Sequence, residues 1–198
     1  MGVYELSGAG SLKTGRTLYT NMGANNVYCA MVPIGTVVAD GSFQSAIFNN
    51  IPQIYQNLML VCSLRSTSGT AQDSFQVQVN NATDIYGSTW LRGDGSTGTS
   101  TRNTSGFYGA PIGNCPSGGG TSGVFGSSTI NVMNYTSTST FKSIICRSAS
   151  DLNGSGDTVL STATLRTTSA LTVLHIFTSS ANMASGSTVT LYGIRAVS

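Results

Sequence analysis

Phe75-Gln76-Val77-Gln78-Val79 places an apolar side chain at every second position. Thr188-Val189-Thr190-Leu191-Tyr192 shows the same period of two near the end of the chain. Successive side chains of a β-strand point to opposite faces of a sheet, so this period predicts strands with one face on a core. Ten candidate strands follow one another between turn residues: Ile34–Val38, Ser42–Phe48, Asn57–Arg65, Ser74–Val79, Ser88–Leu91, Val124–Asn134, Phe141–Ala149, Thr158–Arg166, Ala170–Thr178 and Ser187–Ile194.

These strands predict an all-β fold, an antiparallel β-sandwich of jelly-roll-like form. No window of a dozen residues has apolar residues at the helical spacing, because Gly, Ser, Thr and Asn interrupt every candidate. Asp94-Gly95 and Asn153-Gly154 are predicted hairpin turns, since both residue types tolerate the positive φ of a type I′ turn. Leu58–Cys62 and Leu171–Phe177 are apolar almost throughout, which predicts strands covered on both faces.

Two regions lack the strand pattern. Residues 1–30 are polar and Gly-rich with isolated Leu and Tyr, which predicts an extended N-terminal arm ahead of a sandwich domain over residues 31–198. Residues 93–123 are rich in Gly, Ser and Thr and predict one long loop that is functional or lies on a partner. No charged residue occurs from Asn103 to Phe141, although a loop in open water normally carries some.

Charged residues are scarce throughout the chain. The 9 Lys and Arg and 7 Asp and Glu make up 8% of 198 residues, against about a quarter in an ordinary soluble domain. Ser, Thr and Gly number 29, 26 and 24. Such a surface repels other copies weakly and loses little solvation energy on burial, which predicts a protein packed within an assembly.

The same composition argues against several partners. The nine basic residues are scattered singly, so we expect no nucleic acid. No apolar stretch reaches the length of a membrane span, and no signal peptide is recognised at the N-terminus, so we expect no membrane.

The four cysteines are Cys29, Cys62, Cys115 and Cys146, and no two have the spacing of a metal-binding pair. Cys62 and Cys146 lie within apolar strands and are predicted to be buried thiols. The sequence leaves open whether Cys29 and Cys115 form a disulfide. The absence of a recognised signal peptide favours reduced thiols.

Groups able to carry out acid–base chemistry are few. His175 is the only histidine and is predicted at a core or interface position, and no GxSxG nucleophile motif accompanies it. The carboxylates fall mostly in predicted turns, where such side chains cap their own backbone, and no pair is marked for glycoside hydrolysis. We therefore predict a protein that is not an enzyme, with no catalytic, cofactor-binding or metal-binding residue. A hydrolase remains an alternative hypothesis. The carboxylates are Glu5, Asp40, Asp73, Asp84, Asp94, Asp151 and Asp157.

Residues 151–157, Asp-Leu-Asn-Gly-Ser-Gly-Asp, place oxygen-bearing side chains at alternate positions, as in the first half of a calcium loop. Thr162 stands where the bidentate Glu of such a loop is expected. A β-hairpin turn is the favoured interpretation, and a weak cation site is left open.

Two further motifs lie close together in the sequence. Arg92-Gly93-Asp94 spells an adhesion tripeptide, which we attribute to chance in so Gly-rich a chain. Trp90, beside Tyr86 and Arg92, is the best candidate for a sugar-stacking platform. An aromatic plug at one end of the sandwich is the favoured alternative for this tryptophan.

Several segments in a fixed order carry a family resemblance. They are Met31-Val32-Pro33-Ile34 with Val37-Val38, residues 48–60 (FNNIPQIYQNLML), residues 91–96 (LRGDGS), residues 131–135 (NVMNY) followed by Phe141-Lys142-Ser143, residues 153–156 (NGSG) and residues 187–194 (STVTLYGI). This series resembles a family of small virion proteins of tailed phages, with F-x-x-I-P-x-x-Y-x-x-L near the start and L-Y-G-I at the end. The resemblance covers about residues 31–195 and leaves out the preceding arm.

The resemblance implies a β-sandwich or jelly roll on the outside of a phage particle, and it implies no catalytic residue. Members act as capsid decoration proteins or as tail and fibre components. We predict a capsid decoration or cement protein of the virion, a homotrimer that contacts copies of itself, the major capsid protein or other virion proteins. A fibre is disfavoured because the chain has neither heptads nor repeats. The alternative is a tail, baseplate or fibre component that binds a glycan of the host surface.

Overall fold

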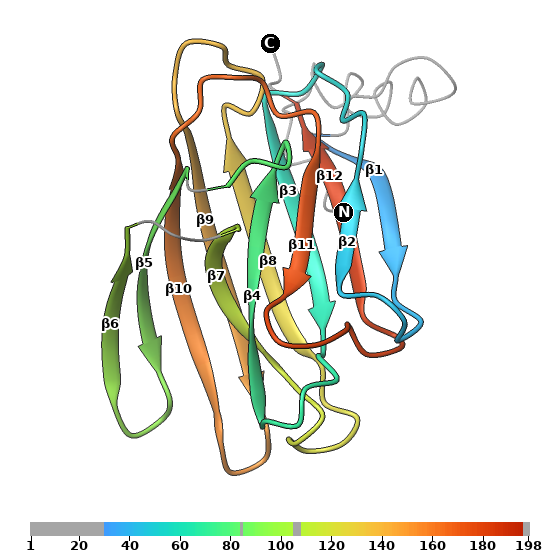
Figure 1. The fold of residues 1–198 in the computed structure, drawn as a ribbon, viewed down its shortest axis with the longest axis vertical. Helices are drawn as coiled ribbons and strands as arrows, with labels where there is room; N and C mark the ends of the chain where they lie inside the picture. The colour runs from blue at the N-terminus through green and yellow to red at the C-terminus, as the bar shows by residue number, and fades with distance from the viewer. Residues whose placement is uncertain (1–29, 84, 105–107, 196–198) are drawn as a thin grey trace, which may run out of the picture.

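The computed structural model describes residues 30–83, 85–104 and 108–195 and places them in two antiparallel β-sheets packed face to face. Figure 1 shows the larger sheet behind and the smaller sheet in front. The predicted all-β sandwich is confirmed, and no helix occurs in these three ranges. No helix among them is long and apolar enough to cross a membrane. The predicted arm lies outside the described residues, apart from its last position.

Eight strands form a jelly roll. Their pairing is nested along the chain: β1 pairs with β12, β2 with β11, β3 with β8 and β4 with β7. This long hairpin is rolled into two sheets of order β1-β12-β3-β8 and β2-β11-β4-β7, the two-sheet arrangement of a jelly roll. The strands are β1 Met31–Val38, β2 Ser45–Phe48, β3 Asn57–Leu64, β4 Gln72–Val79, β7 Ala110–Pro116, β8 Gly126–Met133, β11 Leu174–Thr178 and β12 Thr188–Ile194.

Two inserted hairpins enlarge one sheet only. They continue the larger sheet beyond β8 in the order β9-β10-β5-β6, whereas the smaller sheet ends at β7. The outer strands β5 and β6 therefore extend past the smaller sheet and form an overhang, at the left of Figure 1. The inserted strands are β5 Tyr86–Gly93, β6 Gly98–Asn103, β9 Lys142–Asp151 and β10 Gly156–Leu165.

Alternating side chains build the core between the sheets. Strand β4 alternates half-buried and buried positions, and its Phe75, Val77 and Val79 are fully buried. Strand β3 contributes its alternate apolar residues from the facing sheet, among them Leu58 and Leu60. Each such side chain stabilises the sandwich by about 1.5–3 kcal/mol through the apolar surface it removes from water.

The predicted type I′ turn at Asn153-Gly154 is confirmed. A hairpin turn also occurs at Asp94-Gly95, but the predicted type is wrong, because the Asp94 N–H bonds to the carbonyl of Thr97 and only Gly95 of the pair has positive φ. Asn153 and Gly154 have φ of 60° and 110°, as a type I′ turn requires, and the turn joins β9 to β10. Asp94 and Gly95 open the turn between β5 and β6, where the Asp94 carboxylate accepts hydrogen bonds from the backbone N–H groups of Ser96 and Thr97. These local bonds hold the two ends of the overhang hairpin in register.

The predicted long loop over residues 93–123 is wrong, because it contains β6 and β7. Strand β6 has no apolar residue, and its pairing with β5 through the Asp94-Gly95 turn makes it a strand. Strand β7 is irregular in sequence, with two prolines and a register shift opposite Phe75 and Gln76. It is nevertheless almost entirely buried, because this edge strand of the smaller sheet packs against β9, β10 and β5 of the larger sheet.

The prediction that Leu58–Cys62 is covered on both faces is also wrong within the described chain. Val61, in the middle of this run, is 41% exposed on the outer side of β3. In β11, His175 and Phe177 are likewise only half-buried on the outer side of the smaller sheet. An apolar run of this kind normally belongs to a strand with neighbours on both faces.

Candidate functional site

The outer side of strands β1, β12, β3 and β8 is a surface without charge, which we call the neutral face. These four strands are adjacent, and none of their residues is Asp, Glu, Lys or Arg. Val38, Val61 and Met133 are exposed on it, and Thr36 and Thr190 join their hydroxyls across β1 and β12 at 3.0 Å. The face is therefore a flat mixture of apolar and hydroxyl groups.

The overhang forms the second candidate site, a groove between its inner side and the edge of the smaller sheet. It encloses about 470 Å³. Trp90, Thr99, Thr101 and Asn103 stand on one wall, because pairing in register places Trp90 opposite Thr101. The other wall comes from β4, β7 and the end of β11, with the residues Ser74, Gln76, Pro111, Asn114 and Ser179.

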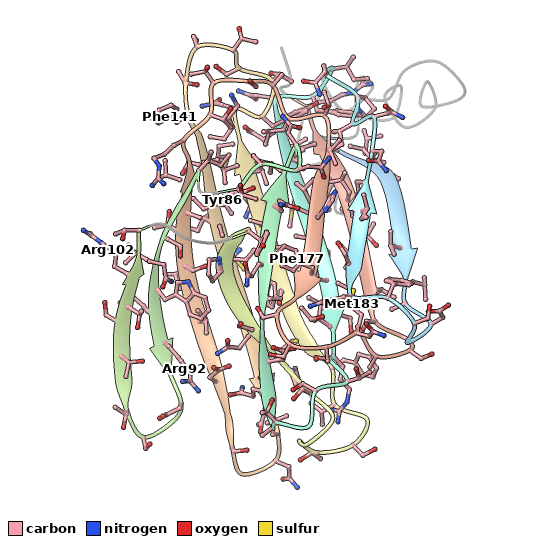
Figure 2. The ribbon with its side chains drawn as sticks, viewed as in Figure 1. Tyr86, Arg92, Arg102, Phe141, Phe177 and Met183 are labelled. Carbon is pink, nitrogen blue, oxygen red and sulfur yellow. The ribbon has the colours of Figure 1, made fainter. Side chains whose placement is uncertain are left out.

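An ion pair anchors the base of this groove. Arg92 Nε lies 2.7 Å from Asp157 Oδ2, and the side chain of Asp157 is 0% exposed. Asp157 also accepts hydrogen bonds from Asn114 Nδ2 at 2.6 Å and from Gln72 Nε2 at 3.0 Å. The network joins β5 of the overhang and its neighbour β10 to β4 and β7 of the smaller sheet. In Figure 2, Arg92 lies against β10, whereas Arg102 points away from the molecule at the outer edge.

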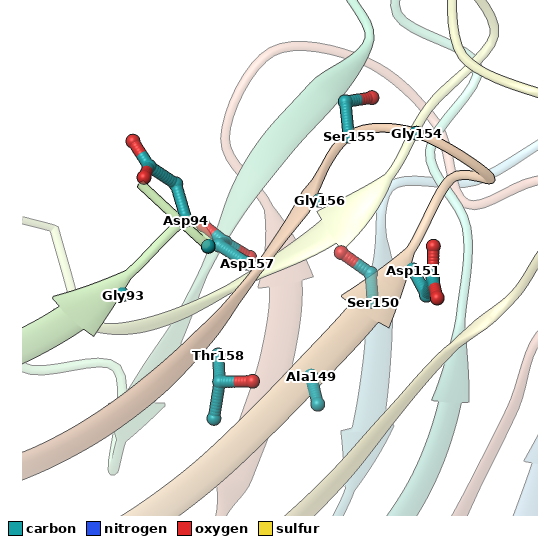
Figure 3. Close-up of a pocket in the computed structure, with 11 residues that line it drawn as sticks. Gly93, Asp94, Ala149, Ser150, Asp151, Gly154, Ser155, Gly156, Asp157 and Thr158 are labelled. Carbon is teal, nitrogen blue, oxygen red and sulfur yellow. The ribbon is translucent and has the colours of Figure 1, made fainter. Parts of the chain in front are cut away.

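The structure separates the two carboxylates of the calcium-like segment. Asp151 is exposed and its Oδ1 accepts the N–H of Asn153 at 2.8 Å, while Asp157 points between the sheets. Figure 3 shows the Asp151 carboxylate turned away from Asp157, so the two do not converge on one ion. Within the described ranges, no group of three or more His, Cys, Asp or Glu side chains is placed to hold a metal.

The remaining described carboxylates cap local backbone or hydroxyl groups. Hydrogen bonds from Ser42 lower the pKa of Asp40, and those from Thr97 and Ser96 lower the pKa of Asp94 to about 2. Asp73 accepts a hydrogen bond from the Ser66 hydroxyl at 2.7 Å. The predicted turn-capping role is thus confirmed for Asp40, Asp94 and Asp151, whereas Asp73 lies within β4. Glu5 and Asp84 lie outside the described residues.

His175 lies on the outer side of β11, opposite Ile47 of β2 and Gln78 of β4. Partial burial lowers its pKa, which favours the neutral imidazole. Neither pairing partner is a carboxylate that could orient the ring as in a catalytic triad. The two charged residues of the Arg92-Gly93-Asp94 tripeptide have separate structural partners. Arg92 pairs with Asp157, and Asp94 caps its own turn.

Three cysteines are buried thiols, as predicted for Cys62 and Cys146. Burial raises the pKa of Cys115 to about 12 and the pKa of Cys146 to about 12, so both are protonated at neutral pH. Cys115 is buried in β7, and Cys29 lies outside the described residues.

The sequence pointed to Trp90 and Arg92 but missed three residues that stand beside Trp90 on the same wall of the groove. Thr99, Thr101 and Asn103 were assigned to a loop, although they alternate directly after an Asp-Gly turn. Tyr86, expected beside Trp90, is instead fully buried, where its hydroxyl donates to the carbonyl of Ala82. Burial raises the pKa of Tyr86 to about 12, which fits a structural phenol.

Comparisons with protein-family models, curated proteins and solved structures gave no match to this chain. The neutral face and the groove are therefore the basis on which its function is argued.

Proposed function

We propose that this protein is a non-enzymatic structural component of a tailed phage virion, a capsid decoration protein that packs against neighbouring copies of itself through the neutral face. The observation that carries the proposal is the complete lack of charge on four adjacent strands that present Val, Met and Thr side chains outward. The centres of protein interfaces are depleted in charged residues and enriched in Met and aromatic side chains. The virion location rests on the family resemblance, which includes tail and fibre components as well as capsid decoration proteins. The choice of the capsid rests on the absence of heptads and repeats from the sequence, and the trimer is a hypothesis of its own.

A second copy is the occupant that the chemistry favours for this face. A surface without charge offers nothing to select a charged partner, and two such surfaces meet without like-charge repulsion. The apolar run of β3 supports the same occupant, because its sequence suits a strand covered on both faces. Covering Val61 and its neighbours with the same face of another subunit would complete that burial.

The use of the charged groups supports a structural role. Arg65 donates to the carbonyls of Thr121 and Val124 at 2.7 and 2.8 Å, and so fixes the loop between β7 and β8. Lys142 is fully buried and donates to the carbonyl of Thr140 at 3.1 Å. Charges committed to holding loops in this way are not available for acid–base chemistry.

Val61→Asp is expected to convert the assembled protein to monomers, because it buries an unpaired carboxylate at the centre of the contact. Sedimentation velocity of the purified chain measures this change. Leu160→Asp is the matched control, since Leu160 is also 41% exposed on the outer side of the same sheet but lies on β10, outside the neutral face. It is expected to leave assembly intact.

A monomeric wild-type chain, or equal loss of assembly in both variants, would contradict the assignment to the neutral face. The virion role has its own test, a density map of the intact particle fitted with this jelly roll. The expected result is density for the sandwich on the capsid surface, with the neutral face against another subunit. Density in the tail instead would refute the decoration role.

Assembly is also expected to resist salt. Raising the NaCl concentration from 0.1 to 1 M shortens the screening length from about 10 to 3 Å, which weakens exposed ion pairs but not apolar contacts. The dissociation constant of the assembled form should therefore change by less than about threefold, or under 1 kcal/mol. Sedimentation equilibrium at the two concentrations provides the measurement, and a tenfold weakening would show that ion pairs hold the contact.

A further inference from the structure

The groove beneath the overhang is not used by contacts through the neutral face. Its wall strands β5 and β6 lie at the opposite end of the larger sheet from β1 and β12. Its volume of about 470 Å³ falls within the range of small-molecule sites, about 300–1,000 Å³. It differs from an ordinary apolar site in that seven of its ten lining side chains carry a hydroxyl or an amide.

The groove presents hydrogen-bonding groups without net charge. Thr99 and Thr101 are exposed, and neither hydroxyl is bonded to another described residue. Asn103 and Asn114 use their Nδ2 groups in bonds to Ser88 and Asp157, which leaves both amide oxygens as acceptors. Hydroxyl and amide groups of this kind both donate to and accept from a ligand that carries many hydroxyls.

The positive charge of Arg92, the cation among the lining residues, is already compensated by an ion pair. Arg92 is paired with the buried Asp157 at 2.7 Å and also reaches Gln72 Oε1 at 3.4 Å. A phosphate or carboxylate ligand would have to compete with the buried carboxylate of Asp157 for this guanidinium, since Arg92 is the cation among the lining residues. The lining therefore favours an uncharged ligand.

The walls of the groove are held before any ligand arrives. Trp90 Nε1 donates to the carbonyl of Pro111 at 2.8 Å, which fixes the indole between the overhang and β7. Ser179 Oγ accepts hydrogen bonds from Gln76 Nε2 at 3.0 Å and from the Ser74 hydroxyl at 2.8 Å. Groups already immobilised in the free protein lose little entropy on binding, which raises affinity.

Trp90 adds an apolar surface to this polar lining. It is half-buried, and its only polar atom is already bonded to Pro111. The indole can therefore meet a ligand only through its apolar ring. A sugar ring has such a counterpart, since its C–H groups form an apolar face while its hydroxyls point sideways.

We propose that this groove binds a neutral oligosaccharide, whose ring packs on Trp90 and whose hydroxyls bond to Thr99, Thr101, Asn103 and Asn114. An apolar ligand would leave these polar groups unpaired, which disfavours it. A peptide would add its backbone to an open strand edge. The edge strand β7 suits this poorly, because Pro111 and Pro116 have no N–H and the carbonyls of Pro111 and Ile112 already accept from Trp90 and Ser161. The proposal is independent of the contact through the neutral face.

The single tryptophan provides a direct probe. Trp90 is the only tryptophan in the chain, so its fluorescence reports on the groove alone. The full-length protein is screened on an array of neutral and acidic bacterial surface oligosaccharides, and each neutral hit is then titrated by tryptophan emission. A saturable change in emission on adding a neutral oligosaccharide is the expected result.

Thr101→Arg tests the location, because it places a long cation in the groove opposite Trp90. It is expected to weaken binding at least about tenfold, the equivalent of 1.4 kcal/mol. Ser100→Arg is the matched control on the adjacent, outward position of the same strand, and its affinity should stay within about twofold. Both positions are exposed, and thermal melting confirms that both variants fold.

Three results would each overturn the proposal: no neutral oligosaccharide binds, only acidic ones bind, or Thr101→Arg binds as the wild type does. Sedimentation of the same samples separates this outcome from the fate of the neutral face. If the protein assembles but binds no neutral oligosaccharide, only the proposal for the groove is refuted. If it binds the oligosaccharide but does not assemble, only the proposal for the neutral face is refuted.

Discussion

Asp157→Ala should lower the free energy of unfolding by about 2–3 kcal/mol. Breaking a fully buried ion pair costs about 3–5 kcal/mol, and this cost is reduced here because Arg92 is 40% exposed and water can solvate it. Asn114 and Gln72 also lose their acceptor, which leaves two amide donors unpaired beneath the overhang. Urea unfolding followed by tryptophan emission measures the change, since Trp90 lines the same groove.

Asp151→Ala is the matched control at the other end of the same turn. Asp151 is exposed and its carboxylate accepts only the backbone N–H of Asn153, so its loss should cost under about 1 kcal/mol. Adding Ca²⁺ should stabilise neither the wild type nor either variant, because the two carboxylates point to opposite faces of the sheet. Equal destabilisation by both substitutions, or a calcium-dependent rise in stability, would refute this account of residues 151–157.

Gly193→Val should prevent stable folding or cost about 3 kcal/mol. A Cβ at this position would stand 2.3 Å from the ring of Tyr55, far inside van der Waals contact. Tyr55 is buried within the packed core, so its ring has little room to move away. Forcing extra carbon into a packed core costs about 1–3 kcal/mol, and more when the neighbours are fixed.

Gly98→Val provides the comparison, since a Cβ at Gly98 would meet no atom within 4 Å. Valine suits an exposed strand position, so the stability of this variant should equal or slightly exceed that of the wild type. Thermal melting followed by far-ultraviolet circular dichroism compares the two. A Gly193→Val protein that melts with the wild type would show that Tyr55 moves aside without cost.

The contact between Tyr55 and Gly193 gives a physical reason for two of the motifs in the sequence. Tyr55 belongs to the I-P-x-x-Y segment and Gly193 to the L-Y-G-I segment, which are 138 residues apart. Tyr135, from the N-V-M-N-Y segment, joins them by donating to the carbonyl of Pro52 and accepting from the N–H of Tyr55. Three segments that are distant in the sequence thus pack together at one end of the sandwich. A substitution in one of them is therefore expected to alter the packing of the others.

The strands themselves were predictable because their signal is local. Alternation in segments such as Phe75–Val79 is a property of a few neighbouring residues, and all ten predicted strands occur in the structure with shifted ends. The turn at Asn153-Gly154 was predictable for the same reason, since positive φ depends on the residue itself. The Asp94-Gly95 pair predicted the place of the second turn but not its type. The scarcity of charge was also plain from composition, and with it the expectation of packing against other subunits.

The groove and the neutral face depend on pairing between distant strands, which no local pattern specifies. Strand β6 has no apolar residue and becomes a strand only because β5 offers its edge. Strand β7 is held, despite its two prolines, by pairing with β4 and by packing against the larger sheet. The larger sheet outgrows the smaller one because both inserted hairpins join the same sheet. Tertiary structure alone therefore decided that Trp90 lines a groove, that Asp157 is buried away from Asp151, and that Val61 is left uncovered, because each outcome is set by which strands lie beside and opposite one another.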